Sequence, residues 1–145
     1  AVVFMPAREK LYTAALGRGA QKNGAGIAPS CTEKLYKSHI LVAKPAMDPT
    51  NWANGVPEIH RYHRPSLAYR LCLVAEGRFD AMLTLRQSWE WDIAAGALIL
   101  SEAGAETSDR TGQPLRFNNP HPQTDGVVAS GAKLHSEILE ALGGK

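Results

Sequence analysis

The stretch WDIAAGALILSEAGA, from Trp91 to Ala105, decides the fold of this chain. Its apolar residues recur at helical spacing with almost no polar interruption before Ser101, so it predicts a helix that is buried nearly all round. Gly104 then ends the pattern, as a glycine commonly does just beyond a helix. At the opposite end, Asp92 places a single carboxylate at the start of this apolar segment.

Two interpretations of Asp92 are open. As an N-cap, its oxygen would accept one of the backbone N–H groups that a helix leaves unpaired, and its charge would suit the positive helix end. As a metal ligand, it would supply the carboxylate oxygen that Mg²⁺ prefers, at a helix terminus where phosphate sites are commonly built. The local pattern does not decide between them.

Strands and helices alternate around this helix. Residues 2–5 and 11–15 predict a hairpin, which the glycine-rich residues 17–26 follow with turns and a loop. Further strands are predicted at 39–43, 79–85, 105–108 and 126–130, and further helices from Ser66, as N-cap, to near Gly77 and over 133–142. The fold class is therefore α/β: a largely parallel sheet with flanking helices, preceded by an antiparallel hairpin from a neighbouring α+β layer. We expect residues 1–30 to end an N-terminal antiparallel region and residues 31–145 to form a C-terminal α/β domain.

Composition limits the classes of function. Hydrophobic residues at 44% and charged residues at 21% are typical of a globular protein, and no apolar run is long enough to span a membrane. The net charge of +2, with scattered Lys and Arg, does not indicate a nucleic-acid polymer as partner. Cys31 and Cys72 form no C-x-x-C pattern, and Cys72 is expected to be a reduced core thiol, which favours a cytoplasmic setting.

Three motifs resemble those of the inositol monophosphatase-like family. Residues 91–105 are similar to its W-D-x-A-A-G-x-L-I-x-x-E-A-G-G signature, with only Ala105 in place of the final glycine. Residues 66–80 resemble its G-S-x-A…L-C-x-V-A-x-G-R-x-D segment, and residues 2–24 resemble its G-V-V-x-x-P…LYTA…G-x-G-A-x-x-N-G hairpin. The resemblance therefore covers almost the whole chain.

The resemblance implies a Mg²⁺-dependent phosphomonoesterase in which Asp92 is a catalytic residue and a metal ligand. The family's other metal ligands come from a Glu-Glu pair and a D-P-x-D-G-T motif that precede the hairpin, and neither motif occurs in this sequence. Asp48-Pro49, followed by Thr50, is better interpreted as the start of a turn or short helix. We therefore expect the chain to be the C-terminal portion of such an enzyme, with little or no activity alone, which pairs with the N-terminal half or forms a homo-oligomer.

Two positions bear on the substrate. The family's Gly-Ser at the place of Ser66 implies a substrate-binding residue, but Pro65 replaces the glycine and lacks its N–H donor. Ser66 in substrate binding and Ser66 as a plain N-cap are therefore both open. Members that act on inositol phosphates carry an acidic residue seven positions before the metal-binding Asp, and Leu85 stands there in this chain. Leu85 accepts no hydrogen bond from a ring hydroxyl.

The substrate expected from the resemblance is a small phosphorylated molecule: an inositol phosphate, a sugar phosphate or a 3′(2′),5′-bisphosphate nucleotide. The Glu90-Trp91-Asp92 triplet and residues 112–118 (GQPLRFN) resemble the bisphosphate-nucleotidase branch. The competing hypothesis is a non-catalytic α/β module that binds a partner chain or a small anion, and the absent metal-ligand motifs favour it. His60 and His63 are interpreted as a surface or satisfied histidine pair rather than as metal ligands, because their odd spacing on a strand would send them to opposite faces.

Overall fold

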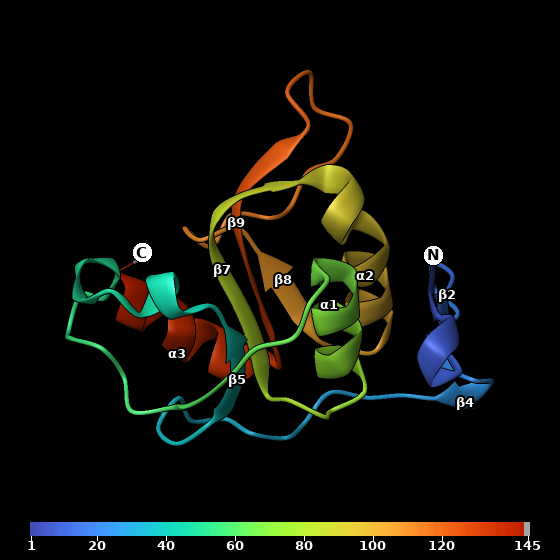
Figure 1. The fold of residues 1–145 in the computed structure, drawn as a ribbon, viewed down its shortest axis with the longest axis horizontal. Coiled ribbons are helices and arrows are strands. Elements are labelled where there is room, and N and C mark those ends of the chain that lie inside the picture. The colour runs from blue at the N-terminus through green and yellow to red at the C-terminus, as the bar shows by residue number, and fades with distance from the viewer. Residues whose placement is uncertain (144–145) are drawn as a thin grey trace.

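A computed structural model describes residues 1–143, which form a layered sandwich of two β-sheets and three α-helices (Figure 1). Helices α1 (Leu67–Ala75) and α2 (Glu90–Glu102) lie between a four-stranded and a five-stranded sheet. Helix α3 (Ala132–Leu142) packs on β8 and β9 of the larger sheet, on the side away from α1 and α2. The predicted α/β class is confirmed.

The four-stranded sheet is an antiparallel meander of β1 (Val2–Met5), β2 (Lys10–Ala14), β3 (Ala20–Lys22) and β4 (Ala25–Gly26). The predicted hairpin is its first half. The prediction of turns and loop alone over residues 17–26 was wrong, because this segment adds two strands. Asn23 and Gly24 both have positive φ, at 50° and 81°, and an Asn-Gly pair in this conformation makes the tight turn that joins antiparallel strands.

The five-stranded sheet has the order β6-β5-β7-β9-β8. Its strands are β5 (His39–Val42), β6 (His60–Tyr62), β7 (Ala81–Trp89), β8 (Glu106–Ser108) and β9 (Gln123–Ser130). β5, β6 and β7 run parallel, and only β9 runs against the other four, so the largely parallel orientation is confirmed. β7 and β9 are longer than predicted because they pair with each other beyond the rest of the sheet, from Ala81 to Trp89.

Both faces of the central part of the larger sheet, at β5 and the first half of β7, are buried. Along β5, Leu41 packs toward α1 and α2 while Ile40 and Val42 pack toward α3, and Met82 and Leu83 alternate in the same way along β7. α2 itself has no exposed residue between Ile93 and Leu100, which confirms the prediction of a helix buried nearly all round. A sheet buried on both faces explains why these strands read as continuous apolar runs.

The remaining segments are short. Three 3₁₀ helices occupy Pro6–Arg8, Lys44–Met47 and Pro49–Asn51. Asp48 is the N-cap of the last, and its Oδ1 accepts a 2.9 Å hydrogen bond from the Thr50 N–H, as the sequence predicted.

Cys72 is a buried free thiol, and burial raises its pKa to about 12. Within residues 1–143, no helix has the length and apolar character needed to cross a membrane.

Candidate active site

The two central helices begin at the same end of the sandwich. Gly96 of α2 lies so close to α1 that a Cβ built there would stand 3.2 Å from the Ala68 carbonyl oxygen. Asp92 is one turn before Gly96, and Ser66 is the residue that precedes α1. The two predicted site residues therefore lie at the N-terminal ends of two neighbouring helices, and parallel strands β5 and β7 run toward the side on which these helices begin (Figure 1). Ligands of open α/β sheets bind at this edge.

Asp92 lies in the first turn of α2, but it is not the N-cap. That position belongs to Trp89, which has an extended conformation and makes no side-chain capping bond. The N-cap interpretation was wrong because β7 runs on to Trp89 and the helix begins immediately after it. The Asp92 side chain is exposed, and within residues 1–143 no hydrogen bond or ion pair engages its carboxylate.

Asp92 is chemically suited to be a metal ligand, because both oxygens of its exposed carboxylate are available to an ion. Mg²⁺ takes about six oxygen ligands and usually keeps several waters among them. Residues 1–143 contain no group of three or more His, Cys, Asp or Glu that could hold a metal ion. The role of Asp92 as a metal ligand stays a prediction.

Glu90 anchors the chain around Asp92. Its side chain is 7% exposed, and its carboxylate accepts hydrogen bonds from the Asn118 N–H at 2.7 Å and the Asn119 side-chain amide at 2.7 Å. Burial opposes ionisation, but these bonds outweigh it and lower the pKa of Glu90. The first turn of α2 is thereby fixed to the loop that precedes β9. Sequence reasoning missed this role because the partners lie 28 and 29 residues further along the chain.

Ser66 is an exposed N-cap. Its Oγ accepts a 3.3 Å hydrogen bond from the Tyr69 N–H, which confirms the predicted cap of α1. Its φ of 64° lies in the left-handed region, which is uncommon for a residue with a side chain. The cap leaves the hydroxyl proton available to a ligand, so substrate binding by Ser66 stays a prediction beside the confirmed cap.

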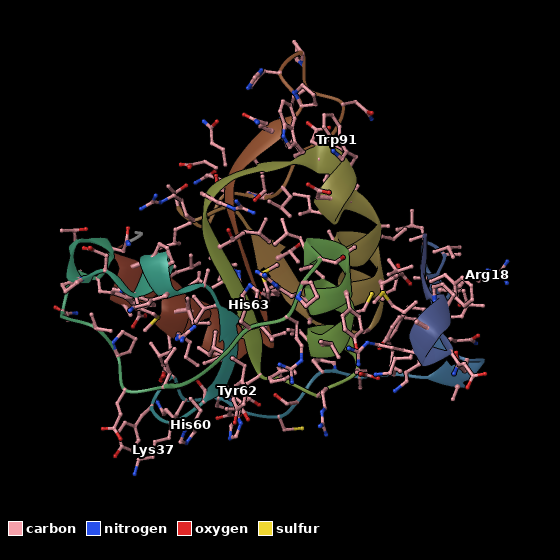
Figure 2. The ribbon with its side chains drawn as sticks, viewed as in Figure 1. Arg18, Lys37, His60, Tyr62, His63 and Trp91 are labelled. Atoms are coloured by element: carbon pink, nitrogen blue, oxygen red, sulfur yellow. The ribbon has the colours of Figure 1, made fainter. Side chains whose placement is uncertain are left out.

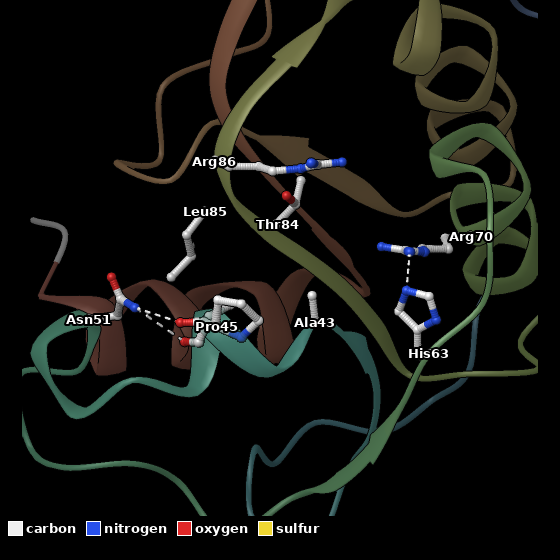
Figure 3. A pocket seen from close by; sticks show the side chains of 9 residues that line it. Ala43, Pro45, Asn51, His63, Arg70, Thr84, Leu85 and Arg86 are labelled. Atoms are coloured by element: carbon white, nitrogen blue, oxygen red, sulfur yellow. Dashed lines mark hydrogen bonds between the residues drawn. The ribbon is translucent and has the colours of Figure 1, made fainter.

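A cavity of about 410 Å³ opens next to these helix ends, between β5, β7 and α1 (Figure 3). Neither Asp92 nor Ser66 lines it. Leu85 does, so the apolar residue at the expected acidic position faces a real cavity. The other lining residues are Ala43, Pro45, Ala46, Asn51, His63, Arg70, Thr84 and Arg86.

Two guanidinium groups dominate the charge of this cavity. Arg70 comes from α1 and Arg86 from β7, and Figure 3 shows both side chains extending into the space between these elements. Arg70 donates to His63 Nε2 at 2.8 Å and to the Arg64 carbonyl oxygen. Burial, followed by the charge of Arg86, lowers the pKa of Arg70. No carboxylate lines the cavity, so it is built to receive negative charge.

Sequence reasoning missed this arginine pair. The two residues are 16 positions apart, on different elements, and only the packing of α1 against β7 brings them to one cavity. His63 fits its interpretation as a surface or satisfied histidine, because its side chain is exposed and its Nε2 accepts a hydrogen bond from Arg70 at the cavity wall. The one available signal was the density of Arg and His within residues 60–70.

A family model described as the inositol monophosphatase family matches residues 1–144. The chain belongs to the inositol monophosphatase family. It is 34% identical over 150 residues to inositol monophosphatase 2 of Solanum lycopersicum, an alignment that covers 97% of this chain and 55% of that protein. It is 31% identical over 146 residues to a fructose-1,6-bisphosphatase/inositol-1-monophosphatase of Aquifex aeolicus, covering 95% and 52%.

Solved structures of the family match nearly all of this chain. The crystal structure of a staphylococcal IMPase-II superposes with a TM-score of 0.80 at 25% identity, and the match covers 97% of this chain and 57% of the other. The resemblance that the motifs predicted is thus confirmed. The chain spans about half the length of the family members it matches.

Proposed function

We propose that this chain provides the C-terminal part of a Mg²⁺-dependent phosphomonoesterase whose substrate carries a second anionic group. The cavity lined by Arg70 and Arg86 is the observation that supports this proposal most directly. Family membership supports the reaction class, since relatives are named as phosphatases of inositol monophosphate and fructose bisphosphate.

Charge is the first reason to favour a bisphosphate over an inositol monophosphate. Two guanidinium groups in one cavity repel each other, and the charge of Arg86 adds to the larger effect of burial in lowering the pKa of Arg70. A phosphate dianion between them would remove that repulsion and would accept the paired N–H donors of each planar group. Leu85, by contrast, offers no acceptor for the hydroxyl groups of an inositol ring.

The position of the arginine-lined cavity is the second reason to favour a bisphosphate substrate. The cavity adjoins the end of the molecule at which α1 and α2 begin, so a substrate could present one phosphate toward Asp92 while a second enters the cavity. The preferred class is a 3′(2′),5′-bisphosphate nucleotide, which carries two phosphates on one ribose. Ser66, at the start of α1, would donate its hydroxyl to the sugar or to the phosphate nearer Asp92.

A Mg²⁺ ion, when bound, would supply positive charge that stabilises the phosphoryl oxygens and favours ionisation of a water molecule. The residues of this chain have simpler tasks. Asp92 holds a metal ion, Glu90 fixes the helix turn that carries Asp92, and Arg70 and Arg86 orient the substrate. Because the family's other ligand motifs are absent from residues 1–145, we expect this chain by itself to turn over little substrate.

The test compares two substrates that differ by one phosphate, adenosine 3′,5′-bisphosphate and adenosine 3′-monophosphate, with the complete polypeptide in which this chain occurs. Arg86→Gln should lower kcat/KM for the bisphosphate about tenfold or more, the equivalent of a lost charge-assisted hydrogen bond, and should leave the monophosphate within about twofold. Arg18→Gln is the matched control, because this exposed side chain lies far from the cavity (Figure 2). Equal losses on both substrates, or preference for inositol 1-phosphate, would contradict the proposal.

A further inference from the structure

A second cavity, of about 500 Å³, lies between the antiparallel sheet and the C-terminal end of α1. Five cationic side chains line it: Arg8, Lys10, Lys22, Arg64 and Arg78. Glu76 is the only carboxylate in its lining. This basic cavity is separate from the arginine-lined cavity described above, since the two share no lining residue.

Glu76 neutralises only part of this charge. Its side chain is 7% exposed, and its two oxygens are already engaged by Lys10, at 3.5 Å, and by Lys22. The Tyr12 hydroxyl beside it is fully buried without a hydrogen-bond partner in the described residues, and burial together with the charge of Glu76 raises the pKa of Tyr12. Within residues 1–143, none of the three arginines forms an ion pair with Glu76.

The three arginines have no anionic partner within residues 1–143. Arg8 lies 5.8 Å from the centroid of the Tyr69 ring, and Arg64 lies 5.6 Å from that of Phe79. Contact with an aromatic face stabilises a cation by about 0.5–1 kcal/mol at exposed sites, but it leaves the charge in place. These rings hold the guanidinium groups at the cavity wall rather than neutralising them.

The negative charge near the basic cavity is too small to neutralise its cationic side chains. Subtracting Glu76 from five cations leaves a surplus of four charges. The C-terminal end of α1 carries the equivalent of only about half a negative charge. A bound anion with several negative charges would supply what the described residues do not.

We propose that the basic cavity binds a small, multiply charged anion that carries phosphate groups. Planar guanidinium groups match phosphate oxygens in pairs, and lysines add point charges. The cavity volume lies within the range of sites for molecules as large as nucleotides. The basic cavity and the proposed substrate cavity are neighbours, since Arg70 of one donates to the carbonyl oxygen of Arg64 in the other, but they share no lining residue.

Pyrophosphate is the first probe, titrated calorimetrically into the protein in EDTA, so that no divalent metal contributes to binding. We expect binding to the wild-type protein and to Arg86→Gln, because Arg86 belongs to the other cavity. Arg8→Gln/Arg78→Gln should weaken binding about tenfold or more. The matched control is Arg18→Gln/Arg116→Gln, which removes the same charge from two exposed arginines outside the basic cavity and should stay within about twofold.

Circular dichroism and melting temperature establish that each variant is folded before titration. ADP, used as a second probe, distinguishes the source of the phosphate: equal or weaker affinity than pyrophosphate assigns an inorganic anion, and higher affinity assigns a nucleotide. Absence of pyrophosphate binding at millimolar concentration would overturn the proposal. So would binding that Arg8→Gln/Arg78→Gln leaves intact, or binding that Arg86→Gln abolishes.

Discussion

Gly96 sets the separation of α1 and α2, and its replacement by alanine should destabilise the protein by about 2 kcal/mol. A Cβ at this position would stand 2.7 and 2.8 Å from the Leu71 Cδ1 and Cβ atoms and 3.2 Å from the Ala68 carbonyl oxygen. Ordinary carbon contacts begin near 3.5 Å, so the two helices would have to separate by roughly 0.7 Å. The Leu71 Cβ and the Ala68 carbonyl belong to the α1 framework and cannot swing aside as a flexible side-chain end can.

Two opposing effects determine this magnitude. Overpacking of a well-packed core costs up to about 3 kcal/mol, whereas alanine stabilises a helix interior by about 1 kcal/mol relative to glycine. The balance is a loss of about 2 kcal/mol, or a melting temperature lower by about 7 °C for a chain of this length. Urea unfolding followed by circular dichroism measures it.

Gly26→Ala is the matched control. Its Cβ would meet nothing within 4 Å, and its φ is not positive, so we expect no loss of stability. If Gly96→Ala unfolds at the same urea concentration as the wild-type protein, the close helix contact inferred here is wrong.

Two further predictions concern buried ionisable groups. Glu90→Gln should lower the melting temperature and raise amide hydrogen exchange at Asn118 and Asn119, because the charge that accepts their N–H groups is lost; unchanged exchange there would remove Glu90 from its anchoring role. Burial lowers the pKa of His135 from its ordinary value of 6.5, so the unfolded chain binds its proton more tightly and the free energy of unfolding should fall as the pH drops below about 6.5. Urea midpoints at pH 7.5 and 5.5 measure this, and His135→Gln should reduce the difference.

The sequence predicted those parts of the fold that depend on local signals. The apolar pattern after Asp92 gave α2, Ser66 gave the start of α1, and the alternating segments gave the α/β class. The Asn-Gly pair at residues 23–24 is a turn signal, but β3 and β4 have only three and two residues, too few for a strand pattern to predict them. β6 was missed because three residues in a proline-rich stretch carry too little periodicity.

Only those residues of the candidate site that belong to family motifs could be predicted from the sequence. Asp92, Ser66 and Leu85 were found by their places in family motifs. Leu85 stands where members that act on inositol phosphates carry an acidic residue, and it lines the cavity. Arg86 and Arg70 line the same cavity only because α1 packs against β7, and no local sequence pattern predicts this tertiary arrangement. The N-cap interpretation of Asp92 failed for a related reason, because pairing with β9 extends β7 and fixes where α2 begins.

The most direct test of the central claim is phosphate release from adenosine 3′,5′-bisphosphate by the complete polypeptide, with and without Mg²⁺, for the wild-type protein and Asp92→Asn. The account predicts Mg²⁺-dependent release that Asp92→Asn reduces by about a hundredfold or more, because a charged metal ligand is lost. Mg²⁺-dependent release that survives in Asp92→Asn would contradict the role of Asp92. No release of phosphate from this substrate, inositol 1-phosphate or fructose 1,6-bisphosphate would instead favour the non-catalytic binding module.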